Sequence, residues 1–302
     1  MKGKKILIVG SSNTDMVIKT QNFPAPGETI LGGRFLMNAG GKGANQAVAA
    51  ARLGGLVTFI GKIGDDIFGK QAVQQLEDEG INVDFVAIDP ENPSGVALIT
   101  VDKKGENSIV VAPGSNGTLS SSDFDKAIAE LDESEFVLMQ LEIPIPTVEH
   151  IAMLAAQRQK KVVLNPAPAA RLSNELLQNL YIITPNETEA ELLTGIKVTD
   201  QQSALLAATA LHSKGIEIVI ITMGSAGAFL LSEGKSEIIS ALKVDAIDTT
   251  AAGDTFNGAL VVALSEGKTI HESIAFANKA AAISVTRIGA QSSVPFRKEI
   301  LN

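Results

Sequence analysis

A carboxylate and three small residues stand together at the start of a predicted helix near the C-terminus. Residues 248–258 are DTTAAGDTFNG and lead into apolar positions at helical spacing, which places Asp254 in the first helical turn. Ala251, Ala252 and Gly253 would let backbone N–H groups approach a ligand closely, and a helix N-terminus favours anions. Such a site could bind phosphate oxygens while Asp254 accepts a proton from a hydroxyl group, as a kinase requires. The simpler alternative is that Asp254 only complements the helix dipole.

A second glycine-rich segment, residues 40–46 (GGKGANQ), also opens a predicted helix. Its glycines would permit close approach of a ligand. The segment is not a P-loop, because Gly43 stands where Ser or Thr must follow the lysine, and Leu36 occupies the upstream glycine position. After the first predicted strand the chain continues as GSSNTD instead of G-x-G-x-x-G, which argues against a dinucleotide-dependent oxidoreductase.

Polar side chains follow the ends of several predicted strands. Asn13 and Asp15 come after the first strand, at the end where open α/β sheets bind ligands. Their side chains suit contacts to sugar hydroxyls, although Asn and Asp also simply favour turns. Glu142 follows another strand and could hold a sugar hydroxyl or be solvated in a loop.

Two further segments have both a structural and a functional interpretation. Asn186 and Glu189 have the spacing of a capping box, which the sequence alone favours, but they could also orient Mg²⁺ through water molecules. Residues 222–227 (TMGSAG) join two apolar runs and could form either a hairpin turn or a cradle for a nucleotide.

The elements that must position these groups alternate along the chain. Runs of β-forming residues such as 6–9, 136–141 and 218–222 are separated by stretches with helical spacing, including 147–159 and 201–214. This alternation predicts a parallel sheet. The runs are apolar almost throughout, which indicates helices on both faces. We therefore predict an α/β fold, a three-layer α/β/α sandwich with a central, mostly parallel sheet.

Two segments, approximately 13–38 and 94–113, depart from this alternation. The first is rich in Pro and Gly, and the second has two β-rich runs on either side of KKGE at 103–106, typical of a β-hairpin. Strands without intervening helices could form a small sheet that stands off the main one as a lid, with Gly32 and Gly33 as candidate hinges. No repeat or linker divides the chain, so we predict one domain over residues 1–302 with this lid inserted in it.

Composition limits the class of protein further. The 302 residues include 25 Lys and Arg against 34 Asp and Glu, and the net charge of −9 opposes binding to nucleic acid or anionic lipid. There is no cysteine, which excludes disulfides, thiolate metal sites and a cysteine nucleophile. No apolar run approaches the roughly 20 residues of a membrane-spanning helix, and polar residues interrupt the N-terminal apolar run. We therefore expect a cytoplasmic protein.

Together with residues 165–168 (NPAP), these motifs resemble the ribokinase branch of the PfkB carbohydrate kinase family over essentially the whole chain. The resemblance implies ATP-dependent phosphorylation of D-ribose to ribose 5-phosphate, with Asp254 as the base and the backbone of Ala251, Ala252 and Gly253 as the anion hole. It implies that the sugar is bound by Asn13, Thr14, Asp15, Gly41, Lys42, Gly43, Asn45, Glu142 and Asp254. It implies that ATP is held by Asn186, Thr222, Met223, Gly224, Ser225, Ala226, Gly227, Gly253 and Asn278.

The same resemblance implies two ions and a partner subunit. Mg²⁺ would lie near Asn186 and Glu189, the latter acting through water, with Lys42 facing the phosphates. A monovalent cation, K⁺, would order the loop before Asp254 without taking part in the chemistry. Its ligands would be the side chains of Asp248 and Ser293 and the backbone carbonyls of Thr250, Ser284, Arg287 and Gly289. Lids of this family often pair with the lid of a second subunit, which implies a homodimer.

Two alternatives remain open from the sequence. The same fold could phosphorylate another acceptor, such as fructose, deoxyribose or a nucleoside, although 4% aromatic residues offer little stacking surface for a base. A non-catalytic sugar or nucleotide sensor on the same scaffold is the second alternative. A sensor would tolerate loss of the base or of the anion hole, whereas Asp254, Gly253 and Asp248 are all present.

Overall fold

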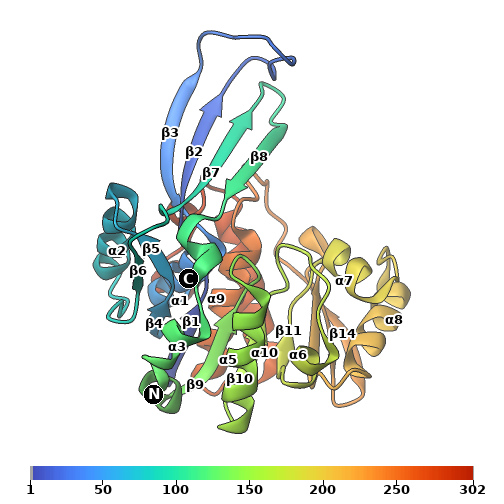
Figure 1. The fold of residues 1–302 in the computed structure, drawn as a ribbon. Coiled ribbons are helices and arrows are strands. Elements are labelled where there is room, and N and C mark those ends of the chain that lie inside the picture. Colours follow the sequence, from blue (N-terminus) through green and yellow to red (C-terminus); the bar gives the residue numbers. More distant parts are fainter. Residues whose placement is uncertain (1–2, 302) are drawn as a thin grey trace.

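The computed structural model describes residues 3–301, which form a large sheet covered by helices and a smaller sheet that stands off it (Figure 1). The large sheet has the strand order β14-β13-β12-β11-β10-β9-β1-β4. Its parallel strands are β4 (Leu56–Ile60), β1 (Lys5–Val9), β9 (Ser134–Met139), β10 (Lys161–Leu164), β11 (Ile182–Ile183) and β12 (Ile218–Thr222). At one edge β13 (Ala228–Ser232) and β14 (Lys235–Ile239) are antiparallel.

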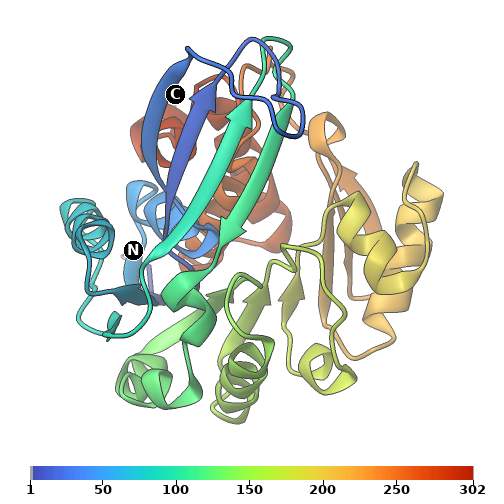
Figure 2. The ribbon, with the colours of Figure 1, turned by 45° about the horizontal axis from the view of Figure 1, so that its top comes forward.

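Successive residues of the central strands fill two separate cores. In β1, Leu7 and Val9 belong to one core and Ile6 and Ile8 to the other, and none of the four side chains is exposed. This explains why the strands are apolar throughout. The predicted three-layer sandwich is therefore confirmed, and Figure 2 shows the sheet between its two helical layers.

Each core lies under its own set of helices. The first is covered by α3 (Ser121–Asp125), α4 (Ile128–Glu133), α5 (Ile145–Gln157), α6 (Asn174–Gln178), α7 (Glu187–Thr194) and α8 (Gln201–His212). The second is covered by α1 (Lys42–Arg52), α2 (Ile67–Asp78), α9 (Ala252–Ser265), α10 (Ile270–Ser284) and α11 (Arg297–Leu301). None of the helices within residues 3–301 is long and apolar enough to cross a membrane.

The smaller sheet, which we call the lid sheet, is made of β2 (Asn13–Lys19), β3 (Arg34–Gly40), β7 (Gly95–Val101) and β8 (Asn107–Ala112) in the order β3-β2-β7-β8. β7 and β8 form the hairpin that the sequence predicts, while β2 and β7 pair in parallel. Short strands β5 (Lys62–Gly64) and β6 (Ala87–Asp89) form a separate parallel pair. The expectation that Gly32 and Gly33 are hinges is wrong, because they lie in the β2–β3 connection at the far end of the lid sheet from the body (Figure 1).

Helices α1 and α9 lie close together because both are rich in small residues. A Cβ on Gly258 of α9 would come within 2.6 Å of the Ala49 Cβ and 2.7 Å of the Gln46 carbonyl oxygen. A Cβ on Gly43 of α1 would lie 2.6 Å from the backbone of Gly10 and of Ser11. Gly43 is thus required for packing of the helix on the chain after β1.

The parallel strands bring many polar residues to one edge of the sheet, because their carboxyl ends all point the same way. β1, β9, β10 and β11 are followed by Ser11, Gln140, Asn165 and Thr184, respectively. Helices α1 and α9 begin at this same edge, and the lid sheet rises from it (Figure 1). The candidate site lies here.

Candidate active site

The side chain of Asp254 is held by two amides from α1. Asn45 Nδ2 donates to Asp254 Oδ2, and Gln46 Nε2 donates to Oδ1, both at 3.0 Å. All three side chains are buried, with exposed fractions of 6%, 0% and 6% for Asn45, Gln46 and Asp254. A buried carboxylate needs such partners, because an unpaired one would lose its hydration without compensation. The two amides leave lone pairs free on the carboxylate for a ligand hydroxyl.

The two amides belong to a longer buried network. Gln46 Nε2 also donates to Asn165 Oδ1 at 3.1 Å, and Gln140 Nε2 donates to Gln46 Oε1 at 2.5 Å. From the end of β11, Thr184 Oγ1 donates to Asn257 Oδ1 at 2.7 Å, and Asn257 Nδ2 donates to the Gly253 carbonyl at 2.9 Å. The network fixes the first turn of α9 relative to three neighbouring strand ends.

The N-terminus of α9 is open to a ligand. Its N-cap residue, Ala251, has a left-handed conformation (φ 59), and no side chain caps the helix. A Cβ added to Gly253 would meet no protein atom within 4 Å, so glycine at this position is not required for packing. Unpaired N–H groups beside open space form a suitable anion site.

Three carboxylates and one ammonium group surround the space above this helix start. Glu142 Oε2 accepts hydrogen bonds from the Ser11 hydroxyl at 2.6 Å and from the Lys42 backbone N–H at 3.0 Å. Burial raises the pKa of Asp15 to about 6, and the charges of Glu142 and Asp254 add to this rise while Lys42 opposes it. Burial alone would lower the pKa of Lys42, but Asp254, Glu142 and other carboxylates raise it above its usual value. Lys42 is therefore a cation at neutral pH.

The predicted residues of β2 are divided between two faces. Asn13 and Asp15 share one face of the lid sheet, whereas Thr14 lies between them and presents its side chain to the other. Asn116 Nδ2 donates to Asn13 Oδ1 at 2.8 Å and to the Ser12 carbonyl at 3.0 Å, which fixes the chain where the lid sheet leaves the body. Gly40 leaves room for the Asp15 side chain, because a Cβ at position 40 would lie 2.3 Å from the Asp15 carboxylate oxygens.

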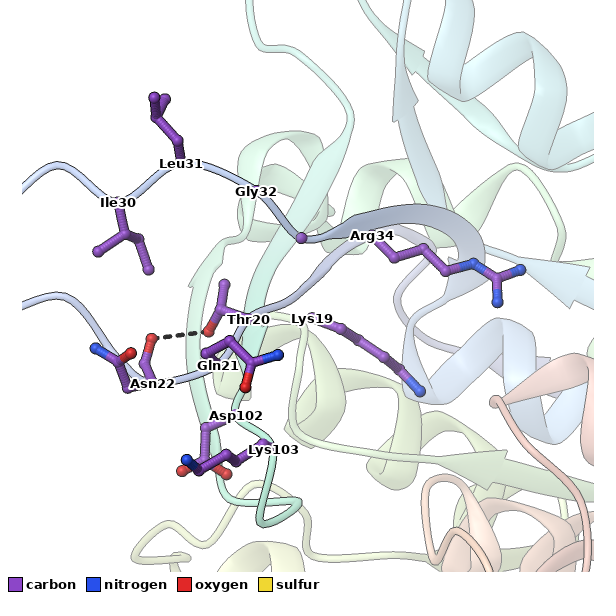
Figure 3. Close-up of a pocket in the computed structure, with 11 residues that line it drawn as sticks. Lys19, Thr20, Gln21, Asn22, Ile30, Leu31, Gly32, Arg34, Asp102 and Lys103 are labelled. Carbon is purple, nitrogen blue, oxygen red and sulfur yellow. Dashed lines mark hydrogen bonds between the residues drawn. The ribbon is translucent and has the colours of Figure 1, made fainter.

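The inner face of the lid sheet is arranged in three rows across its strands. Asn38, Asp15, Ala97 and Val111 form the row nearest the body, followed by Leu36, Val17, Ile99 and Ile109, and then by Arg34, Lys19, Val101 and Asn107. Most of these residues, together with Ile247, Asp248, Thr250, Ile288 and Gly289, line a cleft of about 340 Å³. Figure 3 shows Lys19 and Arg34 extending the same way at the far end of the lid sheet, beside a hollow of about 920 Å³.

The predicted nucleotide segments have clear structural roles. Asn186 Oδ1 accepts from the Glu189 N–H at 2.8 Å and Glu189 Oε2 accepts from the Asn186 N–H at 2.9 Å, so the predicted capping box at the start of α7 is confirmed. β12 and β13 form the predicted hairpin, whose turn contains Gly224, Ser225 and Ala226. Gly227 (φ 104) is required there, because a Cβ would lie 2.1 Å from the Ile239 carbonyl oxygen.

Two other predicted residues contact backbone. Asn278 Nδ2 donates to the Ile239 carbonyl at 2.8 Å, so this amide supports the chain after β14. Met223 packs against the first core.

Asp248 connects the loop before α9 to the chain after α10. Its two carboxylate oxygens accept the backbone N–H groups of Thr250 and Gly289, each at 2.9 Å. Burial would raise the pKa of Asp248, but these hydrogen bonds hold it below its usual value. Ser284 and Ser293, which lie within five residues of Gly289 in the sequence, are fully buried, and their hydroxyls donate to the carbonyls of Ala281 and Ala290. In residues 3–301 no group of three or more His, Asp or Glu side chains is placed to hold a metal ion.

Sequence reasoning did not identify several residues that hold the site together. Gln46, Gln140 and Asn116 are buried amides that orient other site residues. Gln46 could have been found from the sequence, because a polar residue on the Ala- and Val-rich face of a buried helix needs a partner. Asn116 and Gln140 carry no such signal, since their partners are distant in sequence.

A carboxylate and a nearby ammonium group at the open start of a helix are suited to moving a phosphoryl group onto a hydroxyl. Fold and site thus define a small-molecule kinase. The model of the family described as "pfkB family carbohydrate kinase" matches residues 3–297, and the chain belongs to this family.

Individual relatives agree with this assignment. The chain is 52% identical to a ribokinase of Haemophilus influenzae over 99% of its own length and 97% of the relative. It is 38% identical to a deoxyribokinase of Salmonella typhimurium over 96% of its length and 95% of the relative. It is also similar to the solved structure of an Arabidopsis thaliana ribokinase complexed with ribose and ATP, with a TM-score of 0.93, 33% identity and coverage of 99% and 98% of the two chains.

The raised pKa of Asp15 predicts that this residue destabilises the folded protein at neutral pH. An aspartate with a folded-state pKa of about 6 and an ordinary value of 3.8 binds more protons when folded, so its destabilising effect is small near pH 4, grows as the pH rises toward 6 and is complete above it. We expect Asp15→Asn to raise the free energy of unfolding by about 1–2 kcal/mol at pH 7.5 and to change it little at pH 4. Urea unfolding at both pH values measures this.

The matched control is Asp245→Asn, which removes one exposed carboxylate from the body. It should leave the unfolding free energy within about 0.5 kcal/mol at either pH. Equal stability of Asp15→Asn and the wild-type protein at pH 7.5 would contradict the prediction.

Proposed function

We propose that the protein transfers the γ-phosphoryl group of ATP to the 5-hydroxyl of D-ribose. The observation that carries this proposal is the buried Asp254 carboxylate, held by Asn45 and Gln46 in the first turn of the uncapped helix α9. The ribokinases among the relatives support ribose as the acceptor. Because ATP is the donor, we place the enzyme in the cytoplasm.

The sugar would bind between the lid sheet and the body. Asp15 and Asn13 face the space from β2, and Glu142 faces it from the end of β9. The reacting hydroxyl would lie at Asp254, which accepts its proton as the oxygen attacks the γ-phosphorus. The bond to the bridging oxygen of ADP breaks, and the charge on the transferring group is stabilised by the N–H groups of residues 251–253 and by Lys42.

The lid sheet would also suppress attack of water on ATP. The inner face of the lid sheet carries an apolar middle row, and apolar Ile247 and Ile288 stand across the cleft with exposed fractions of 66% and 62%. Closure of the lid sheet over a sugar would bury these side chains and exclude water from the phosphoryl group.

Replacement of the proposed base is the direct test. We expect Asp254→Asn to lower kcat for ribose by about 10²–10⁴-fold, because general-base catalysis contributes about this much. ADP release from Mg·ATP with ribose, 2-deoxyribose, fructose and a nucleoside as acceptors measures both the effect and the acceptor preference. The deoxyribokinase relative makes 2-deoxyribose the competing acceptor.

The outcomes separate the proposals. Preference for another acceptor with the same loss in Asp254→Asn would keep the mechanism and change the substrate. Wild-type protein that turns over no acceptor, but binds ribose or ATP, would favour the sensor. Circular dichroism of Asp254→Asn provides the check on folding.

Two cations belong to this proposal. Mg²⁺ would enter with ATP and neutralise its phosphates, and Glu189 could orient it through water because its Oε1 is free of the capping box formed by Oε2. K⁺ would bind at Asp248, Ser293 and the carbonyls of Thr250, Ser284, Arg287 and Gly289. This set of oxygen donors, with a single carboxylate, fits a weakly charged cation. It would keep the loop before α9 in place and take no part in the chemistry.

The K⁺ proposal predicts activation through Asp248. We expect K⁺ to raise kcat at constant ionic strength with tetramethylammonium as the replacement ion, and Asp248→Ala to abolish the response because the tie between Thr250 and Gly289 is lost. ADP release against K⁺ concentration measures it, with Asp245→Ala as control. Full wild-type activity without any small monovalent cation would refute the proposal.

We also propose a homodimer formed through the outer face of the lid sheet. By the alternation of the strands, this face carries Ile18, Phe35, Met37, Leu98 and Val110, whose exposed fractions lie between 44% and 65%. A continuous apolar sheet face of this kind is unusual on a monomer. Pairing of two such faces would remove it from water.

A charged substitution on this face tests the dimer. We expect Leu98→Asp to convert the protein to a monomer in sedimentation velocity, because burial of an unpaired charge opposes association. Leu206→Asp is the matched control, since Leu206 is similarly exposed (56%) on α8. A wild-type protein that is monomeric at micromolar concentration would overturn the proposal.

A further inference from the structure

An asparagine stands beside Asp15 in the row of the lid sheet nearest the body. Asn38 of β3 is directly opposite Asp15 of β2, and the two side chains line the same cleft. Directly opposite residues in antiparallel strands have Cβ atoms about 5 Å apart. A ligand group in contact with the Asp15 carboxylate is therefore within reach of the Asn38 amide.

Asparagine is an unfavourable residue at position 38, in the middle of strand β3. Asparagine is depleted in β-strands, and its neighbours Phe35, Leu36 and Met37 are all apolar. Among residues 3–301 its side-chain amide has no hydrogen-bond partner, so no capping or bracing role explains it. Positions that break local rules without a structural compensation are often functional.

A count of donors and acceptors gives Asn38 a role. The side chains around the sugar space are mainly acceptors, namely the carboxylates of Asp15, Glu142 and Asp254. Gln46 uses both of its amide N–H groups, on Asp254 and Asn165, and Asn45 uses one of its two on Asp254, so the amides of Asn13 and Asn38 are the main remaining donors near Asp15. A sugar hydroxyl that donates its proton to Asp15 still has two lone pairs, and an ionised carboxylate cannot donate to them.

We propose that the Asn38 amide N–H donates to the same secondary sugar hydroxyl that donates to Asp15, so that the two side chains together select the acceptor. The hydroxyl is the 2- or 3-hydroxyl of the pentose, on the opposite side of the sugar from the group at Asp254. This inference rests on the proposed function. It adds a specificity residue that lies outside the sequence motifs.

Two substitutions at this position separate hydrogen-bond donation from space filling. We expect Asn38→Ala to raise KM for ribose about tenfold with little change in kcat. This is the effect of losing one hydrogen bond to a hydroxyl that is itself bound to the Asp15 carboxylate. Asn38→Asp preserves the shape of the side chain but removes the donor, so at pH 7.5 it should raise KM for ribose more than Asn38→Ala does. Its activity relative to wild type should recover as the pH falls, because a protonated carboxyl group can donate. A space-filling role predicts the opposite order.

Deoxy sugars identify the hydroxyl. We expect Asn38→Ala to have almost no effect on KM for either 2-deoxyribose or 3-deoxyribose, whichever lacks the hydroxyl that Asn38 binds, and the full effect on the other. The matched control is Asn22→Ala, which removes an exposed amide from the β2–β3 connection, outside this cleft, and should leave KM unchanged. Urea unfolding of each variant tests whether the fold is preserved.

The outcomes distinguish this inference from the proposed function. Wild-type protein that phosphorylates no pentose refutes the proposed function. Wild-type protein that phosphorylates ribose, with Asn38→Ala unchanged in KM or equally impaired for ribose and both deoxy sugars, refutes the role of Asn38 alone. A lower free energy of unfolding without a change in KM would indicate that Asn38 has only a structural role, in the small crevice that it lines with Phe68 and Gln71 of α2.

Discussion

The hydrogen bonds from Asn45 and Gln46 to Asp254 are the constraint on which the rest of the site depends. A carboxylate that is 6% exposed must be paired, and both of its partners come from one turn of α1. This pairing requires α1 and α9 to lie very close, which is possible because Gly258 of α9 faces Ala49 and the Gln46 carbonyl of α1 without a side chain between them. Close packing of the two helices therefore holds the Asp254 carboxylate at the open start of α9.

The same site is rich in negative charge, and this has consequences for stability and selectivity. Burial and its carboxylate neighbours raise the pKa of Asp15, so the folded protein keeps an unfavourable charge where a ligand is to bind. Lys42 offsets part of it. A polyhydroxylated ligand would bring hydroxyl donors to these carboxylates. Under the proposed function, a bound sugar would offset part of this unfavourable charge.

Several features could be predicted because they are local. The capping box of Asn186 and Glu189 depends on residues three apart, and the hairpins β7–β8 and β12–β13 depend on turns of a few residues. The apolar strands predicted a sheet covered on both faces. Gln46, Asn116 and Gln140 were missed, because each acts on residues about 90 or more positions away, which no periodicity reports.

The sequence by itself determined the order of strands and helices, the position of Asp254 in the first turn of a helix, and the composition of both glycine-rich segments. These follow from propensity and spacing, which act over a few residues. Only the tertiary structure decided that Gly43 serves packing, that Thr14 faces away from Asp15, and that Asn38 stands beside Asp15. Each of these depends on register or on helix-to-strand distance, and both are set by contacts between segments far apart in the chain.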